Sequence, residues 1–157
     1  MGTFPQLITE DVQRLNKALG DLLQKTDATI SAIIDYGGFL ITSQGDTTGI
    51  DLTTIAALSS GTYLANQTIA NLVHETNFSS VYQQGEKHSL FIVSVDQYCL
   101  LAVIFNEKST VGVVKYFAAD AVQRIARQLV IAHERAPGSG LDLSELNLSD
   151  PSDLFKR

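Results

Sequence analysis

Hydrophobic side chains recur at helical spacing in three segments of the chain. In the first, residues 9–25, apolar positions three or four apart define one face of a helix. These positions are Ile8, Val12, Leu15, Leu19 and Leu22. Thr9 is the expected N-cap of this helix, with Glu10 and Asp11 placed near its positive end. A second helix is expected to start at Asp51 as its cap and to run to about residue 75.

The third helical segment is expected to begin near Ser109 or Thr110, and the domain to end with it near His133. Its opening turns, TVGVVKYF, are rich in β-branched residues and also fit a strand. The expected buried face consists of Val111, Val114, Phe117 or Ala118, Ala121, Ile125, Leu129 and Ala132. The expected solvated face consists of Asp120, Gln123, Arg124, Arg127 and Arg135.

Five strands are predicted between these helices. The runs ATISAIID and FLITSQG, separated by two glycines, indicate a hairpin. Residues 78–84, 88–95 and 98–105 follow as a meander, with short polar turns between them. The order is therefore αββαβββα, which fits one α+β sandwich in a chain of 157 residues.

The DYGG segment, residues 35–38, has two interpretations. Gly37 and Gly38 can supply the positive backbone angles that tight hairpin turns require, while the Asp35 carboxylate hydrogen-bonds neighbouring amides. The alternative is a catalytic carboxylate, but Asp35 has no partner in the same stretch. Local geometry accounts for DYGG without catalysis, so we favour the structural interpretation.

The second helix has two uncharged sides, which is unusual. One stripe is expected to lie on the sheet, and its members are Ile55, Leu58, Thr62, Ala65, Ile69 and Leu72 or Val73. The opposite stripe, expected to be the interaction surface, consists of Ala57, Ser60, Gly61, Leu64 and Thr68. Gly61 costs about 1 kcal/mol relative to alanine in mid-helix, which suggests that another backbone approaches closely there. Two interpretations fit this pattern: the helix is buried on both sides within one domain, or its second side is an intermolecular surface. We favour the intermolecular surface, because a single layer of helix over a small sheet leaves the back of the helix uncovered.

Charge and composition exclude several classes of protein. The formal net charge is −6, the pI is about 4.9, and Lys and Arg form no cluster along the sequence, which argues against nucleic-acid binding. Neither a signal-peptide pattern nor an apolar window of about 18 residues is present, so we expect a cytoplasmic protein without membrane insertion. Cys99 lies in the apolar run YCLLAVIF, which favours buried packing over redox chemistry.

Motifs for catalysis are missing from the sequence. There is no phosphate loop, dinucleotide fingerprint, HExxH segment or pair of cysteines at metal-binding spacing. His74, His88 and His133 stand at the ends of predicted elements, where histidine commonly caps carbonyls or faces water. We therefore expect no active site, no cofactor and no metal site.

The C-terminal part, residues 134–157, differs in composition from the rest. APGSG, residues 136–140, is a flexible linker by composition, and the following segment mixes acidic residues with leucines. Such a segment suits either a short docking motif or an inert solubilising tail. Composition alone does not separate these two alternatives.

The order of elements, together with IIDYGGFLITSQG, DLTTIAALSSG and SLFIVSV…YCLLAVIF, resembles the roadblock family of dynein light-chain-like proteins. The resemblance covers about residues 8–133 and is greatest to the bacterial MglB-type branch, which regulates the small Ras-like GTPase MglA. It extends to the tail, where MglB-type chains often carry a DLF-like motif, here Asp153, Leu154 and Phe155. The resemblance implies a roadblock-type domain with a five-stranded, mostly antiparallel sheet and helices on both faces.

The resemblance also implies a function. MglB-type proteins are homodimers whose central helices form a platform for the GTPase, and they accelerate GTP hydrolysis by reorganising the partner's own catalytic residues. Ala57, Ser60, Gly61, Leu64 and Thr68 would carry this platform, and Leu154 and Phe155 would let the tail reach the partner and influence nucleotide exchange. The process served would be bacterial polarity or motility. Tyr63 and Leu64 depart from the small residues usual in this branch, which affects the expected docking geometry.

Two other functions fit the same sequence. A roadblock scaffold would bind a GTPase or hold a larger assembly together without changing the rate of hydrolysis. A small-molecule sensor of the related αβ sandwich type is disfavoured, because polar residues are missing from any obvious cavity position.

Overall fold

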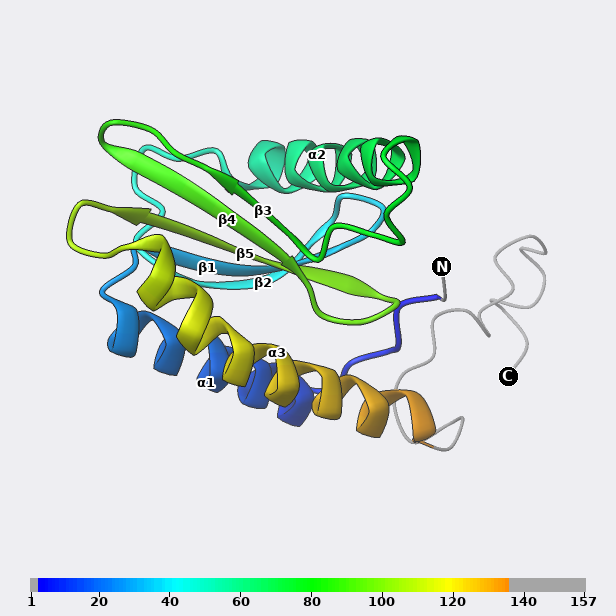
Figure 1. The fold of residues 1–157 in the computed structure, drawn as a ribbon. Coiled ribbons are helices and arrows are strands. Elements are labelled where there is room, and N and C mark those ends of the chain that lie inside the picture. Colours follow the sequence, from blue (N-terminus) through cyan, green and yellow to red (C-terminus); the bar gives the residue numbers. More distant parts are fainter. Residues whose placement is uncertain (1–2, 136–157) are drawn as a thin grey trace, which may run out of the picture.

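One antiparallel sheet carries helices on both faces in the computed structural model, which describes residues 3–135 (Figure 1). Helices α1 and α3 lie side by side on one face, and α2 lies alone on the other. The elements are α1 Thr9–Thr26, β1 Ile30–Asp35, β2 Leu40–Gly45, α2 Leu52–Leu72, β3 Ser80–Gln83, β4 His88–Ser94, β5 Cys99–Asn106 and α3 Val111–Glu134. The predicted α+β order is confirmed, and α3 is helical from its first turn, so the alternative of a strand there is wrong.

The strand order is β2-β1-β5-β4-β3, and every neighbouring pair is antiparallel. Strand β1 therefore lies between its hairpin partner β2 and the distant β5, with Ile30 opposite Ile104 and Asp35 opposite Cys99. The sheet is antiparallel throughout, where the sequence predicted a mostly antiparallel one. Its two edges are β2 and β3.

Alternating side chains of the central strands build two separate hydrophobic layers. Ile33 of β1 faces α1 and α3, while Ile30, Ala32 and Ile34 face α2. The α1/α3 layer also contains Leu15, Leu19, Phe91, Leu101, Val103, Ile125 and Leu129. Ser31 points into this layer, where its hydroxyl donates to the Leu19 carbonyl at 3.1 Å and fastens α1 to the sheet.

The predicted cap Asp51 is confirmed, and Thr110, near which the last helix was expected to begin, is the N-cap of α3. Asp51 accepts the backbone N–H of Thr54 at 3.1 Å, and Thr110 accepts that of Val113 at 3.2 Å. The predicted cap Thr9 is wrong, because helix α1 already includes it and the N-cap is Ile8. The Ile8 side chain has no oxygen, so the Asp11 carboxylate accepts the Ile8 N–H at 2.9 Å instead.

Asp11 also joins the beginning of α1 to the end of α3. Its carboxylate is fully buried and accepts two hydrogen bonds from Arg135, at 2.7 and 2.8 Å, and one from Gln128 at 2.7 Å. The Arg135 guanidinium, more than any other neighbour, holds the pKa of Asp11 at about 2. The sequence placed Arg135 on a solvated face, and this is corrected: it pairs with a buried acid 124 positions earlier.

Candidate protein-interaction site

Helix α2 is rotated relative to the orientation that its hydrophobic pattern predicted. The residues it buries are Leu52, Ala56, Ser59, Ser60, Tyr63 and Ala70. Leu58, Ile69 and Leu72, which the sequence placed on the sheet, are instead 66, 49 and 74% exposed. Both stripes of this helix are apolar or small, so hydrophobicity did not distinguish them. Apart from Leu52 in its first turn and Tyr63 in its middle, α2 buries only small side chains.

Ser60 belongs to the buried side, so its assignment to the exposed stripe is wrong. Its side chain is almost fully buried, and its hydroxyl donates to the backbone carbonyl of Tyr36 at 2.6 Å. The Tyr36 ring lies 5.9 Å from the ring of Tyr63, and its hydroxyl donates to the Asp96 carbonyl at 2.8 Å. Burial raises the pKa of Tyr36 to about 12. This network ties the middle of α2 to the DYGG turn and to the turn before β5.

The DYGG turn lets the hairpin approach α2 closely. Gly38 has a φ of 90°, and a Cβ added there would lie 3.1 Å from the Cα of Ala57. Asp35 Oδ1 accepts the N–H of Phe39 at 2.9 Å, as the structural interpretation predicted. Only one of the two glycines has a positive φ, however, so the expectation for Gly37 is wrong.

The outward face of α2 is exposed and uncharged. Ala57, Gly61, Leu64 and Thr68 lie on it, together with Leu58, Ile69 and Leu72. No Asp, Glu, Lys or Arg occurs from Leu52 to Leu72. A Cβ added at Gly61 would meet nothing within 4 Å, so no backbone within the described part of this chain approaches it. We call this set of exposed residues the α2 face.

Other candidate residues do not form a site with the α2 face. Cys99 is buried as predicted, and burial, helped by the neighbouring Asp96 carboxylate, raises the pKa of its thiol. The His133 ring packs against the Tyr98 ring at 5.6 Å, and His88 is exposed at the start of β4. Within residues 3–135, no group of three or more His, Cys, Asp or Glu side chains is placed to hold a metal ion. Leu154 and Phe155 lie outside the described residues.

Between residues 3 and 135, no helix is long and apolar enough to span a bilayer. The candidate site is the α2 face, which extends from Ala57 to Leu72 over about four helical turns. Interface cores are depleted of charged residues relative to the rest of a protein's surface, and the α2 face has this composition. The fold and this surface define a small α+β domain with the features of a protein-interaction module.

Comparison with known proteins identifies the family. The sequence profile of the Roadblock/LC7 domain matches residues 15–105, and the chain belongs to this family. Solved structures of MglB are similar to this chain over most of its length. "MglB with tetrameric arrangement" has 26% identity and a TM-score of 0.77, with 84% of this chain and 99% of that chain covered.

Two further MglB structures have comparable similarity. The gliding protein MglB of Thermus thermophilus has 27% identity and a TM-score of 0.77, covering 84% of this chain and 100% of that one. MglB of Myxococcus xanthus has 26% identity and a TM-score of 0.76, covering 83% and 98%. No curated protein matches the chain by sequence. The predicted MglB-like roadblock domain is thus confirmed as a family assignment.

Proposed function

We propose that this protein is a homodimeric regulator of a small Ras-like GTPase of the MglA type, and that it accelerates GTP hydrolysis by its partner. Its place in bacterial polarity or motility is part of the same proposal. Family membership and similarity to MglB support the class of partner. The observation that carries the proposal is the exposed, uncharged α2 face.

The α2 face is difficult to explain within a monomer. A solvated helix ordinarily carries charges on its free side, whereas Leu58 and Leu72 here are more than half exposed. Gly61 lowers helix stability by about 1 kcal/mol relative to alanine, yet no neighbour in the described chain needs the space. A surface approached by another molecule accounts for both features.

The mechanism would act through binding rather than through a catalytic group of this chain. Helix α2 contains no Lys or Arg, so its face has no cation to insert beside the γ-phosphate of a bound nucleotide. A regulator of this kind accelerates hydrolysis by binding the hydrolysis-competent conformation of the GTPase more tightly than the resting one. Two copies of the chain would supply a continuous surface. The tetrameric arrangement named for one MglB structure is a precedent for self-association in a similar protein.

The test is single-turnover phosphate release by the MglA-type GTPase of the same genome, with and without this protein. We expect acceleration that grows with added protein and is lost in Gly61→Arg, which adds charge and bulk to the α2 face. Two controls are matched to this variant. Gly61→Ala keeps the face small, and Gly112→Arg adds the same side chain to an exposed glycine of α3 on the other side of the sheet.

The outcomes separate the proposed function from its alternative. If the protein binds the GTPase without accelerating GTP hydrolysis, it is a scaffold rather than an activator. If Gly61→Arg binds the GTPase as the wild type does, the α2 face is not the binding surface. Removing residues 153–157, which contain Leu154 and Phe155, tests the tail separately. If these residues reach the GTPase, their removal changes the rate of nucleotide exchange, while the acceleration of GTP hydrolysis through the α2 face is retained.

A further inference from the structure

The cationic side chains of this acidic protein are concentrated on α1 and α3. Six of the 11 Lys and Arg residues lie within these two helices, although the net charge of the chain is −6. They are Arg14, Lys17, Lys25, Lys115, Arg124 and Arg127. Because α2 has none, the two faces of the sheet differ in electrostatic character as well as in the number of helices.

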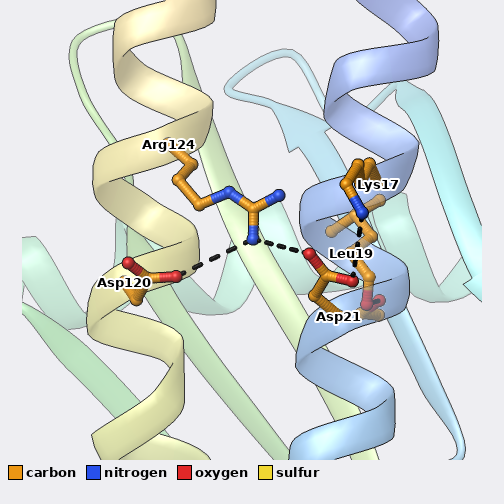
Figure 2. Close-up of polar contacts among 6 residues, drawn as sticks. Lys17, Leu19, Asp21, Asp120 and Arg124 are labelled. Carbon is orange, nitrogen blue, oxygen red and sulfur yellow. Dashed lines mark hydrogen bonds and ion pairs between the residues drawn. The ribbon is translucent and has the colours of Figure 1, made fainter.

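A groove of about 450 Å³ runs between α1 and α3 on their outer side. Its lining contains four cationic side chains, Arg14, Lys17, Arg124 and Arg127, together with Gln128 and Ile131, and no carboxylate. Figure 2 shows one end of this region, where Lys17 and Asp21 of α1 face Arg124 and Asp120 of α3. Arg124 lies 2.9 Å from Asp21, and this pair links the two helices.

Two of the four cations, Arg14 and Arg127, remain available to an acidic partner, whereas Lys17 and Arg124 are paired with Asp21. Arg14 pairs with Glu10 at 3.0 Å, but both side chains are 62% exposed, and exposed pairs exchange partners at little cost. Arg127 has no ion pair within residues 3–135; its Nε donates to the Gln123 carbonyl at 3.4 Å. Ile131, about half exposed, adds an apolar surface among these charges. The groove therefore suits a peptide that combines carboxylates with aliphatic side chains.

The segment LDLSELNL, residues 141–148, has this composition and follows the C-terminal end of α3 in the sequence. It contains two acidic residues and four leucines. Helix α3 ends at Glu134, and Ile131 is less than one turn before that end. Residues 136–140, if extended, span up to about 17 Å, whereas Arg124 lies about 16 Å back along the helix axis from Arg135. A connection of this length is thus sufficient for the segment to run back along α3 as far as Arg124.

We propose that residues 141–148 bind the α1/α3 groove of their own chain, with Asp142 and Glu145 on its arginines and leucines against Ile131. A five-residue connection gives the segment an effective concentration of the order of millimolar, so even weak contacts suffice to hold it. The tail is then retained on the face of the sheet opposite the α2 face. Binding to the groove competes with any other use of the tail and weakens as ionic strength rises. This inference does not depend on the proposed GTPase.

The experiment measures paramagnetic broadening in the full-length protein. A nitroxide is attached at Ser144→Cys, while the native Cys99 is buried and stays unlabelled. We expect the backbone amide signals of Gln128 and Ile131 to have less than half of the intensity that they have after the nitroxide is reduced. Arg127→Glu, at an exposed position of the groove, should restore them. The matched control Lys108→Glu reverses an exposed cation in the turn before α3, away from the groove, and should leave the broadening intact.

Three outcomes would overturn the proposal. The first is full intensity in the groove, and the second is broadening confined to the α2 face. The third comes from mixing spin-labelled protein at natural isotope abundance with ¹⁵N-labelled protein that has no spin label. Equal broadening in this mixture would mean that the tail binds a second copy rather than its own chain. Loss of the broadening in about 0.5 M salt, where the Debye length is about 4 Å, would support the charge pairing.

Discussion

The buried carboxylate of Asp11 is expected to make the stability of the protein depend on pH. Its pKa is about 2 in the folded protein, against an ordinary value of 3.8. A pKa that is depressed by folding stabilises the native state above the unfolded value, and this contribution is lost as pH falls through the folded one. At 1.36 kcal/mol per unit, the difference corresponds to about 2 kcal/mol at neutral pH.

The perturbation is Asp11→Asn, which keeps the shape of the side chain and removes its charge. Arg135 then faces a neutral amide, so we expect the variant to be less stable by about 2 kcal/mol or more at pH 7. The linkage relation predicts that the wild type has lost about 1 kcal/mol of this contribution by pH 3. The difference between the two proteins should shrink by that amount, because the amide does not titrate.

Urea unfolding at pH 7 and pH 3, at one fixed protein concentration, measures the difference in unfolding free energy between the two proteins and its decrease at low pH. The matched control is Glu10→Gln, which neutralises the adjacent acid in an exposed pair with Arg14 and should change the free energy of unfolding by less than about 0.5 kcal/mol. If Asp11→Asn equals the wild type at pH 7, or if the difference is the same at pH 3, the assigned role of the Asp11–Arg135 pair is wrong.

Two further predictions concern the backbone and the thiol. Gly20→Ala should raise the midpoint of thermal unfolding, since a Cβ there meets nothing within 4 Å and alanine favours the helix by about 1 kcal/mol. Gly45→Ala should lower the midpoint strongly, because the φ of Gly45 is 110° and an added Cβ would clash with the Thr29 carbonyl oxygen. Similar midpoints for the two variants would contradict this. Cys99 should not react with a thiol-specific disulfide reagent at pH 8 until denaturant is added, because its side chain is buried and its thiol pKa is raised; rapid labelling of the native protein would show that β5 opens readily.

The fold could be predicted from sequence because its elements have clear periodicity and clear ends. The runs rich in β-branched residues do form strands, and the cap Asp51 stands where it was expected. Helix α3 begins next to Thr110, near the expected start. The orientation of α2 could not be predicted, because this helix carries small and apolar residues on all its sides. Its sequence therefore does not indicate which side is buried. Ser60 can be buried because its hydroxyl donates to the carbonyl of Tyr36. Tyr36 lies in the DYGG turn, 24 positions earlier in the sequence.

The Asp11–Arg135 pair left a signal that periodicity could have revealed. Asp11 lies four and seven positions before Leu15 and Ala18, so it shares their buried face. A carboxylate in that position needs a partner, but the sequence cannot say which of 11 cations supplies it. The candidate interaction residues Ala57, Gly61, Leu64 and Thr68 do lie together on the exposed side of α2. Their role in binding a partner remains a prediction.

The position of β1 in the sheet has a kinetic consequence. Its hairpin partner β2 follows within a few residues, but its other neighbour β5 begins more than 60 residues later. Closing so long a loop costs chain entropy before any native contact compensates for it, and proteins with many such pairings fold slowly. Until β5 arrives, β1 presents an apolar strand with an open edge, which is the form in which strands recruit other chains. A newly made chain is therefore most vulnerable to misassociation between the synthesis of α2 and that of β5.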